Sequence, residues 1–336
     1  MPTIREVSLR AQVSTATVSR VLNKTGSVNE MTRQRVLEAI DELGYRPNAF
    51  AQSLASNRSD AIGVIINEIT SPSYAGIARG IEQIAEAHNM HLLVSSGHAD
   101  LELERKAVEF LKRRRSDVLI VHLEATPDYD IIALSKETTP LVIVGRYIPE
   151  LEDSCVCLDN IMGGYQATRY LIDQGHKRIA HITGWLAIHD SRDRLDGYKQ
   201  ALAESDIAFD ESLVVEGNFN ESSGQRAAVR LLERGLDFSA IFVANDQMAA
   251  GALQALREHG LSIPDDISLV GYDDVLLARY VYPALTTIRQ PLEAMGRAAA
   301  ELALAKLEPT PLAKPNKEVT RRFEPELIVR QSVRAL

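Results

Sequence analysis

From residue 61 onward, short apolar segments alternate with longer amphipathic ones, and this alternation restricts the possible folds most strongly. The apolar segments have the length and continuous hydrophobicity of strands buried on both faces. We expect strands at 62–67, 91–96, 117–122, 140–145, 155–159, 178–184, 213–217, 240–245 and 267–274. Helices are expected at 74–89, 101–114, 162–174, 191–204, 221–234 and 246–259, with a weaker one between 122 and 140. This order predicts parallel sheets covered on both faces by helices.

The pattern of strand and helix starts a second time after residue 159. It therefore predicts an α/β core of two lobes, each a doubly wound parallel sheet, joined near residue 160. Ligands of such sheets bind at the carboxyl ends of the strands. With two lobes facing each other, we expect the ligand in the cleft between them.

The candidate ligand-binding residues are those that follow the expected strands. They are Ser73, Tyr74, Gly145, Arg146, Asp159, Asn160, Trp185, His189, Asp190, Arg194, Phe219, Asn245, Asp246, Tyr272, Asp273 and Asp274. Carboxylates and guanidinium groups form paired hydrogen bonds with sugar hydroxyls, while aromatic rings stack on the apolar face of the sugar. Each residue could instead be a helix cap or a loop charge, and Asp246 in particular could be only an N-cap.

The N-terminal segment predicts a separate, all-helical unit. Apolar residues recur at helical spacing in two runs, first Ile4, Val7 and Ala11, and then Val18, Val21 and Leu22. Between the runs, Ser14 or Thr15 can cap a new helix start. Two short helices joined by a tight turn form a helix-turn-helix. The beginning of the second helix would enter the DNA major groove, where Thr15, Ala16 and Arg20 could meet base edges.

A third helix is expected in MTRQRVLEAIDELGY (31–45), ended by Gly44. Thr32, Arg33 and Arg35 near its start could hold DNA phosphates, which supply affinity and register without reading sequence. Residues 1–59 carry a net charge of +3 and the remaining residues −12. A basic head on an acidic body suits a polyanion partner for the head alone, although the imbalance is too small to decide the matter.

Residues 47–59 connect the two parts. Pro47 stops the third helix, and Asn48 can cap a short helix that is too short to be stable alone. Such a helix would fold only against its mate in a dimer or against DNA, and Leu54 could then insert into a minor-groove base step. A plain interdomain linker is the alternative, but the helix-forming composition favours a hinge helix.

Length and composition limit the class of protein. A chain of 336 residues suggests two or three domains. It has no apolar run near the ~20 residues of a membrane span and no signal-peptide core at its start, so we expect a cytoplasmic protein. Cys155 and Cys157 lie on the same face of one expected strand and are poorly placed to bridge each other.

An enzyme or a transport binding protein could use the same two-lobed fold. The sequence contains no GxGxxG after the first strand, no phosphate-binding loop, no GxSxG and no HExxH. Its eight histidines show no metal-ligand spacing; His176 and His181 flank an expected strand. We therefore expect no enzymatic activity, no cofactor and no metal.

Several long segments resemble the LacI/galactose-repressor family of bacterial transcription regulators. They are TIREVSLRAQVSTATVSRVLN (3–23), GYRPNAFAQSLA (44–55), DRLDGY (193–198), ANDQMAAGAL (244–253) and GYDDVLLARYVYPALTTIRQP (271–291). IPELEDSCVCLDN (148–160) is most similar to the galactose-type members. The resemblance implies a helix-turn-helix head at 1–46, a hinge helix at 47–59 and a periplasmic-binding-protein-like core at 60–336. Within that core it implies an N-lobe of 60–160 and about 291–321, and a C-lobe of about 161–290 and 322–336.

The resemblance also implies the functional residues. Thr15, Ala16 and Arg20 would read bases, and Leu54 of each subunit would insert at the centre of a palindromic operator. The full expected DNA-binding set is Thr3, Ser14, Thr15, Ala16, Thr17, Ser19, Arg20, Asn23, Thr32, Arg33, Asn48, Ala51 and Leu54. In the core, Arg194 is the implied cleft arginine, Asp246 the hydroxyl-binding aspartate and Phe219 a stacking aromatic. The full expected effector-binding set is Tyr74, Arg146, Asp159, Trp185, Asp190, Arg194, Phe219, Asn245, Asp246 and Asp273.

The implied function is a repressor of carbohydrate-utilisation genes that a small sugar controls allosterically. Galactose or a galactoside acting as inducer is the first expectation; another sugar, a glucoside or a purine-like effector is the alternative. The loop GWLAIHD (184–190) and the pair Ser73-Tyr74 depart from the galactose-type pattern and bear on which sugar binds. No leucine heptads follow SVRAL, so a homodimer is expected rather than a tetramer.

Overall fold

The computed structural model describes residues 2–22, 26–46, 59–307 and 321–336. The chain forms two compact units, Met1–Ser59 and Asp60–Leu336. None of the described helices is both long and apolar enough to cross a membrane. The expected hinge helix at 47–59, with Asn48, Ala51 and Leu54, falls almost entirely outside the described residues, and so does Asn23.

The N-terminal unit contains the three expected helices, α1 (Ile4–Arg10), α2 (Thr15–Leu22) and α3 (Glu30–Leu43). Side chains cap each start: Thr3 forms a capping box with Glu6, and the Ser14 hydroxyl accepts a hydrogen bond from the Thr17 N–H at 3.1 Å. Gly44 ends α3 in the left-handed conformation at φ 59°, as predicted. The apolar core of this unit consists of Val7, Ala11, Val18, Val21, Val36 and Ala39. Helix-turn-helix geometry is therefore confirmed.

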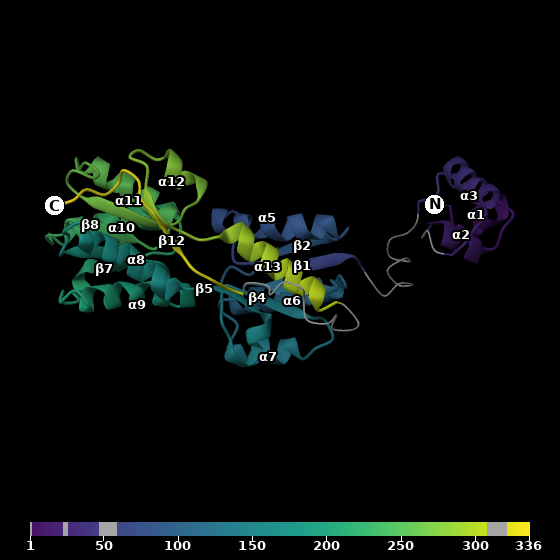
Figure 1. Ribbon diagram of the computed structural model, residues 1–336, viewed down its shortest axis with the longest axis horizontal. Helices are drawn as coiled ribbons and strands as arrows, with labels where there is room; N and C mark the ends of the chain where they lie inside the picture. Colours follow the sequence, from purple (N-terminus) through teal and green to yellow (C-terminus); the bar gives the residue numbers. More distant parts are fainter. Residues whose placement is uncertain (1, 23–25, 47–58, 308–320) are drawn as a thin grey trace. The chain divides into compact units, whose positions relative to one another are not determined.

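The core unit contains two six-stranded sheets (Figure 1). The first has the order β11-β5-β4-β3-β1-β2, from β1 (Ala61–Ile66), β2 (His91–Ser96), β3 (Val118–Val121), β4 (Leu141–Val144), β5 (Cys155–Leu158) and β11 (Arg322–Phe323). The second has the order β12-β10-β9-β8-β6-β7, from β6 (Ile179–Thr183), β7 (Val214–Glu216), β8 (Ala240–Val243), β9 (Ser268–Asp273), β10 (Thr286–Arg289) and β12 (Glu326–Ile328). All pairs are parallel except β10 with β12.

Helices cover both sheets. The first lobe has α5 (Pro72–Ala87), α6 (Leu101–Arg113), α7 (Asp128–Ser135) and α13 (Leu292–Ala305). The second has α8 (Asn160–Asp173), α9 (His189–Ala203), α10 (Glu221–Glu233), α11 (Asp246–Glu258) and α12 (Leu276–Tyr280). Short 3₁₀ turns at Pro149–Ser154 and Glu211–Leu213 precede β5 and β7. The two-lobed, doubly wound core is thus confirmed, and Cys155 and Cys157 are both free and buried.

In the described residues, the chain passes between the lobes at three places. It crosses after β5, after β10, and between β11 and β12. We expected the last crossing at about residue 321, whereas the strand pairing places it between Phe323 and Glu326, because Arg322 and Phe323 pair with β5 in the first sheet. The first crossing, between Leu158 and Asn160, brings Asn160 to the start of α8 at the cleft.

Candidate functional site

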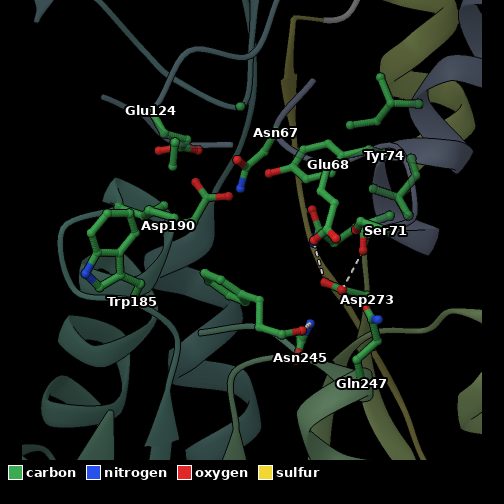
Figure 2. Close-up of a pocket in the computed structure, with 18 of the residues that line it drawn as sticks. Asn67, Glu68, Ser71, Tyr74, Glu124, Trp185, Asp190, Asn245, Gln247 and Asp273 are labelled. Carbon is green, nitrogen blue, oxygen red and sulfur yellow. Dashed lines mark hydrogen bonds between the residues drawn. The ribbon is translucent and has the colours of Figure 1, made fainter. Parts of the chain in front are cut away.

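A cavity of about 310 Å³ lies between the two lobes. Its walls come from segments that follow strands or end them, namely Asn67 after β1, Gly145 after β4, Trp185 after β6, Asn245 after β8 and Asp273 at the end of β9. Figure 2 shows polar side chains from both lobes directed into this space. The cavity is therefore at the carboxyl ends of both sheets, where a doubly wound fold binds its ligands.

Most of the expected effector-binding residues line the cavity. They are Tyr74, Trp185, Asp190, Arg194, Phe219, Asn245 and Asp273. Arg146, Asp159 and Asp246 are not among the residues that line it. The Arg146 guanidinium pairs with Asp128 at 2.6 Å, and the Asp159 carboxylate accepts the Met162 N–H at 2.9 Å as the cap of α8. Arg146 and Asp159 instead line a smaller cavity of about 150 Å³ beside the first crossing.

Asp246, an expected effector-binding residue, is buried and bonded to the protein itself instead of facing the cavity. Its side chain is fully buried, and its two oxygens accept hydrogen bonds from the Thr287 hydroxyl at 2.7 Å and the Val275 N–H at 3.0 Å. Burial raises the pKa of this carboxyl well above its usual value. The cap of α11 is Asn245, whose side chain accepts the Met248 N–H at 2.9 Å. Asp246 thus connects α11 to β10 and the segment after β9, whereas Asp190 and Asp273 line the cavity.

Arg194 is held in place by four groups of the second lobe and the first crossing. Its Nε donates to Asn160 Oδ1 at 2.9 Å and its Nη1 to the Ala244 carbonyl at 2.6 Å. Its guanidinium also lies 3.7 Å from Asp190 and 3.9 Å from Asp273. A Cβ on Gly164 would come within 2.1 Å of the Arg194 carbonyl, so only glycine permits this close approach of α8 and α9. The guanidinium is therefore a fixed donor at the floor of the cavity.

Asp273 forms a contact that crosses the cleft. Its Oδ2 accepts a hydrogen bond of 2.6 Å from the hydroxyl of Ser73 at the start of α5 in the first lobe. Its Oδ1 accepts a hydrogen bond of 2.5 Å from the Gln290 side-chain amide. A ligand hydroxyl that donates a hydrogen bond to Asp273 would compete with Ser73 and so alter a contact between the lobes.

Two aromatic residues offer stacking surfaces in the second lobe. The Trp185 side chain is 44% exposed and lies beside Asp190 at the edge of the cavity (Figure 2). The Phe219 backbone has φ 70°, and its ring lies where a Cβ on Gly184 would be, at 2.1 Å. Gly184, the residue before Trp185, therefore makes room for the second aromatic ring.

Several cavity residues were not among the candidates. They are Asn67, Glu68, Ser71, His98, Glu124, Gln247 and Gln290. The rule that residues after strands form the site would have found Asn67 and Glu68 after β1 and Gln290 after β10. Glu124 lies three residues beyond β3, so a search confined to the first residues after each strand does not reach it.

His122, Glu124 and Asp190 form a charged cluster at this cavity, which we call the acidic cluster. Their ligand atoms all lie within 4.8 Å of one another, and within the described ranges no other group of three such residues is close enough to hold a metal ion. His122 Nε2 is 3.2 Å from Glu124 Oε1. Burial, followed by the nearby Asp190 carboxylate, raises the pKa of Glu124 to about 8, and burial lowers the pKa of His122. The cluster could therefore hold a cation.

The head presents a polar surface along the start of α2. Ser14, Thr15, Ala16 and Arg20 are exposed, whereas Val18 and Val21 are buried against the other two helices. Of the remaining expected DNA contacts that are described, Thr3 is exposed, and Thr17, Ser19, Thr32 and Arg33 are partly buried. The side chains expected to read bases are thus free to do so.

Comparisons with known proteins match both units. Residues 3–48 match the family described as bacterial regulatory proteins, lacI family, and residues 168–333 match a periplasmic binding protein-like domain. The chain is 42% identical to the HTH-type transcriptional regulator GalR of Escherichia coli, over 99% of this chain and 96% of that protein. It is 41% identical to GalS of Salmonella typhimurium, over 90% and 89% of the two chains. The solved lac repressor dimer bound to operator and the anti-inducer ONPF superposes with a TM-score of 0.86 at 30% identity, covering 99% of both chains.

Proposed function

The chain belongs to the LacI family of bacterial regulatory proteins, and from this premise we propose that it is a sugar-controlled repressor of carbohydrate genes. The head binds operator DNA through the exposed start of α2. The cavity between the lobes binds a small sugar. Galactose or a galactoside acting as inducer is the ligand that the similarity to GalR and GalS favours.

The composition of the cavity carries this proposal. Acceptors (Asp190, Asp273), a fixed guanidinium (Arg194) and an amide (Asn245) lie in one space with an exposed indole (Trp185). Directed donors and acceptors around an apolar ring face suit a polyhydroxylated ring, whose edges are polar and whose C–H faces are apolar. Its volume of about 310 Å³ is at the lower end of ligand cavities.

The position of the cavity supports allosteric control. Ser73 and Glu124 reach it from the first lobe, and Asp190 and Asp273 from the second, so a ligand that binds both sides changes how the lobes close. In a homodimer on a palindromic operator, a change in closure would alter how the two heads are presented to DNA. A coupling free energy of about 1–3 kcal/mol is enough to change operator affinity by one to two orders of magnitude.

The test begins with the full-length protein and a pool of random duplexes, from which its operator is selected. Binding to the selected duplex is then measured by fluorescence anisotropy at physiological ionic strength, with and without galactose, methyl galactosides and a panel of other sugars. We expect a palindromic site and at least one sugar that lowers the affinity about tenfold or more. Failure to select any site, or an affinity that no sugar changes, would refute the proposal.

A further inference from the structure

Two carboxylates from opposite lobes meet in the sugar cavity. Glu124 extends from the segment after β3, and Asp190 lies in the first turn of α9 (Figure 2). Together with His122 they place their ligand atoms within 4.8 Å of one another, and the Glu124 side chain is only 7% exposed. Two such carboxylates repel each other in a poorly hydrated cavity unless a proton or a positive charge lies beside them.

Within the part of the chain that the structure describes, no cationic side chain is committed to this pair of carboxylates. The Arg194 guanidinium lies 3.7 Å from Asp190, but it is shared with Asp273, and its Nε and Nη1 donate to Asn160 and the Ala244 carbonyl. Arg146, whose charge also acts on Glu124, is paired with Asp128 at 2.6 Å. The one ion-pair contact of Glu124 among the described residues is with His122. Burial lowers the pKa of this imidazole, so at neutral pH it is uncharged.

The same part of the cavity contains further unmatched hydrogen-bonding atoms. Asn67 Oδ1 is buried without a hydrogen-bond partner, and Asn67 lines the same cavity as Glu124 and Asp190. His122 is 6% exposed, and its Nδ1 also lacks a partner. When both carboxylates are ionised, they and the amide oxygen supply acceptors only. A primary ammonium group has three N–H donors, a positive charge and no acceptor, so it matches this set.

We infer that the cavity prefers an amino sugar, whose ammonium group lies between Glu124 and Asp190 and is also bound by Asn67. This inference rests on the proposed sugar-binding function of the same cavity and specifies its ligand class. The ring hydroxyls then face Arg194 and Asp273. A charge-assisted hydrogen bond is roughly twice as strong as a neutral one, so replacing one hydroxyl by an ammonium selects for the amino sugar over its neutral parent.

Binding of the ammonium should also release a proton. The pKa of Glu124 is raised to about 8 by burial and by Asp190, so the empty cavity holds a proton on this carboxyl at neutral pH. A positive charge beside Glu124 favours the ionised carboxylate and displaces that proton. The enthalpy of binding measured at pH 7 will therefore depend on the ionisation enthalpy of the buffer for an amino sugar and much less for its neutral parent.

Isothermal titration calorimetry on the full-length protein tests this inference. Two matched series, galactose with galactosamine and N-acetylgalactosamine, and glucose with glucosamine and N-acetylglucosamine, change only the group at one carbon. In the series that binds, we expect the amine to bind at least about tenfold more tightly than the parent sugar, and the uncharged acetamide to lose this gain. Glu124→Gln should abolish the preference, whereas Glu233→Gln, the same change on an exposed residue of α10, should retain it.

The outcomes separate this inference from the proposed function. If neutral sugars bind as tightly as their amines, or if the preference survives in Glu124→Gln, the inference is wrong and sugar binding stands. Neutral-sugar binding that is lost in EDTA and restored by Zn²⁺ or Mn²⁺ would also overturn it, because a metal ion would then occupy the acidic cluster. If no sugar of any kind binds or alters operator affinity, the proposed function itself fails.

Discussion

Replacing Asp246 tests whether this residue stabilises the fold or contacts the ligand. In Asp246→Ala, the Val275 N–H and the Thr287 hydroxyl lose their partner in a fully buried place. Each orphaned polar group costs about 1–3 kcal/mol, so the free energy of unfolding should fall by about 2–6 kcal/mol. At an m-value of about 3 kcal/mol per molar urea, the unfolding midpoint should fall by roughly 0.7–2 M.

Asp246→Asn is the matched control. Burial raises the pKa of Asp246 well above its usual value, which favours the neutral carboxyl, and asparagine has nearly the shape of that group. The Asn oxygen can accept the Val275 N–H, and its amide can donate to Thr287 Oγ1. We therefore expect a loss of about 1 kcal/mol or less.

Urea titration followed by far-ultraviolet circular dichroism gives the stability, and calorimetry at 10 °C gives sugar affinity for the molecules that remain folded. If Asp246 acts as the structure indicates, stability falls in the alanine variant while the dissociation constant for sugar changes less than about threefold. The reasoning is refuted if the alanine variant unfolds like the wild type but binds sugar more than tenfold more weakly, since Asp246 would then contact the ligand directly.

Four other perturbations test the head, the hinge and the cavity. Arg20→Ala should cost about 1–3 kcal/mol on the selected operator and little on random DNA, measured by anisotropy; equal losses would indicate a phosphate contact. Leu54→Gly should abolish most specific affinity and keep calorimetric sugar binding, and an unchanged operator affinity would contradict a minor-groove wedge. Sugar should change the fluorescence emission of Trp185, the one tryptophan of the chain, in a saturable way, and Trp185→Phe should weaken sugar binding. Tight sugar binding without a change in emission, together with an unchanged affinity in Trp185→Phe, would refute stacking. The pKa of Glu124 is raised from 4.5 to about 8, so between these pH values the folded protein retains a proton that the unfolded chain releases, and the free energy of unfolding should fall as pH rises. In urea titrations, Glu124→Gln should flatten this pH dependence. Parallel curves for the variant and the wild type would assign the pH dependence to other groups.

The sequence contained enough local information to predict every strand from β1 to β9. Most of these strands are short apolar runs that are fully buried, as in VLIV (118–121) and AIFV (240–243), whereas β2 is only partly buried; helices separate them. β11 was not predicted, because Arg322 and Phe323 are too few to form a pattern and pair only through the geometry of β5. β12 likewise depends on its partner β10, with which it pairs antiparallel.

The site was predicted better in the second lobe than in the first. Trp185, Asp190, Arg194 and Asn245 were found because distinctive polar or aromatic residues follow strands there. The error at Asp246 has a physical cause. Asn245 and Asp246 are adjacent in the sequence. Which of the two faces the cavity depends on the other segments of the chain against which their side chains pack. Asp246 is held by residues 29 and 41 positions away, which local sequence patterns cannot specify.

Asn160 explains how ligand contacts and lobe closure can be coupled in one place. It lies at the first crossing between the lobes, and its Nδ2 donates to Asp190 at 3.0 Å. Its Oδ1 accepts from Arg194 Nε at 2.9 Å and from the Tyr272 hydroxyl at 3.1 Å. A sugar that draws Asp190 or Arg194 into new hydrogen bonds must therefore also act on the side chain that anchors the crossing. Asp273, which accepts the Ser73 hydrogen bond across the cleft, lies 3.9 Å from the Arg194 guanidinium, so one ligand can act on both contacts between the lobes. Allosteric control requires that the sugar bind the open and closed arrangements of the lobes with different affinity. These shared contacts provide such a difference without a further chain of residues between the site and the crossing.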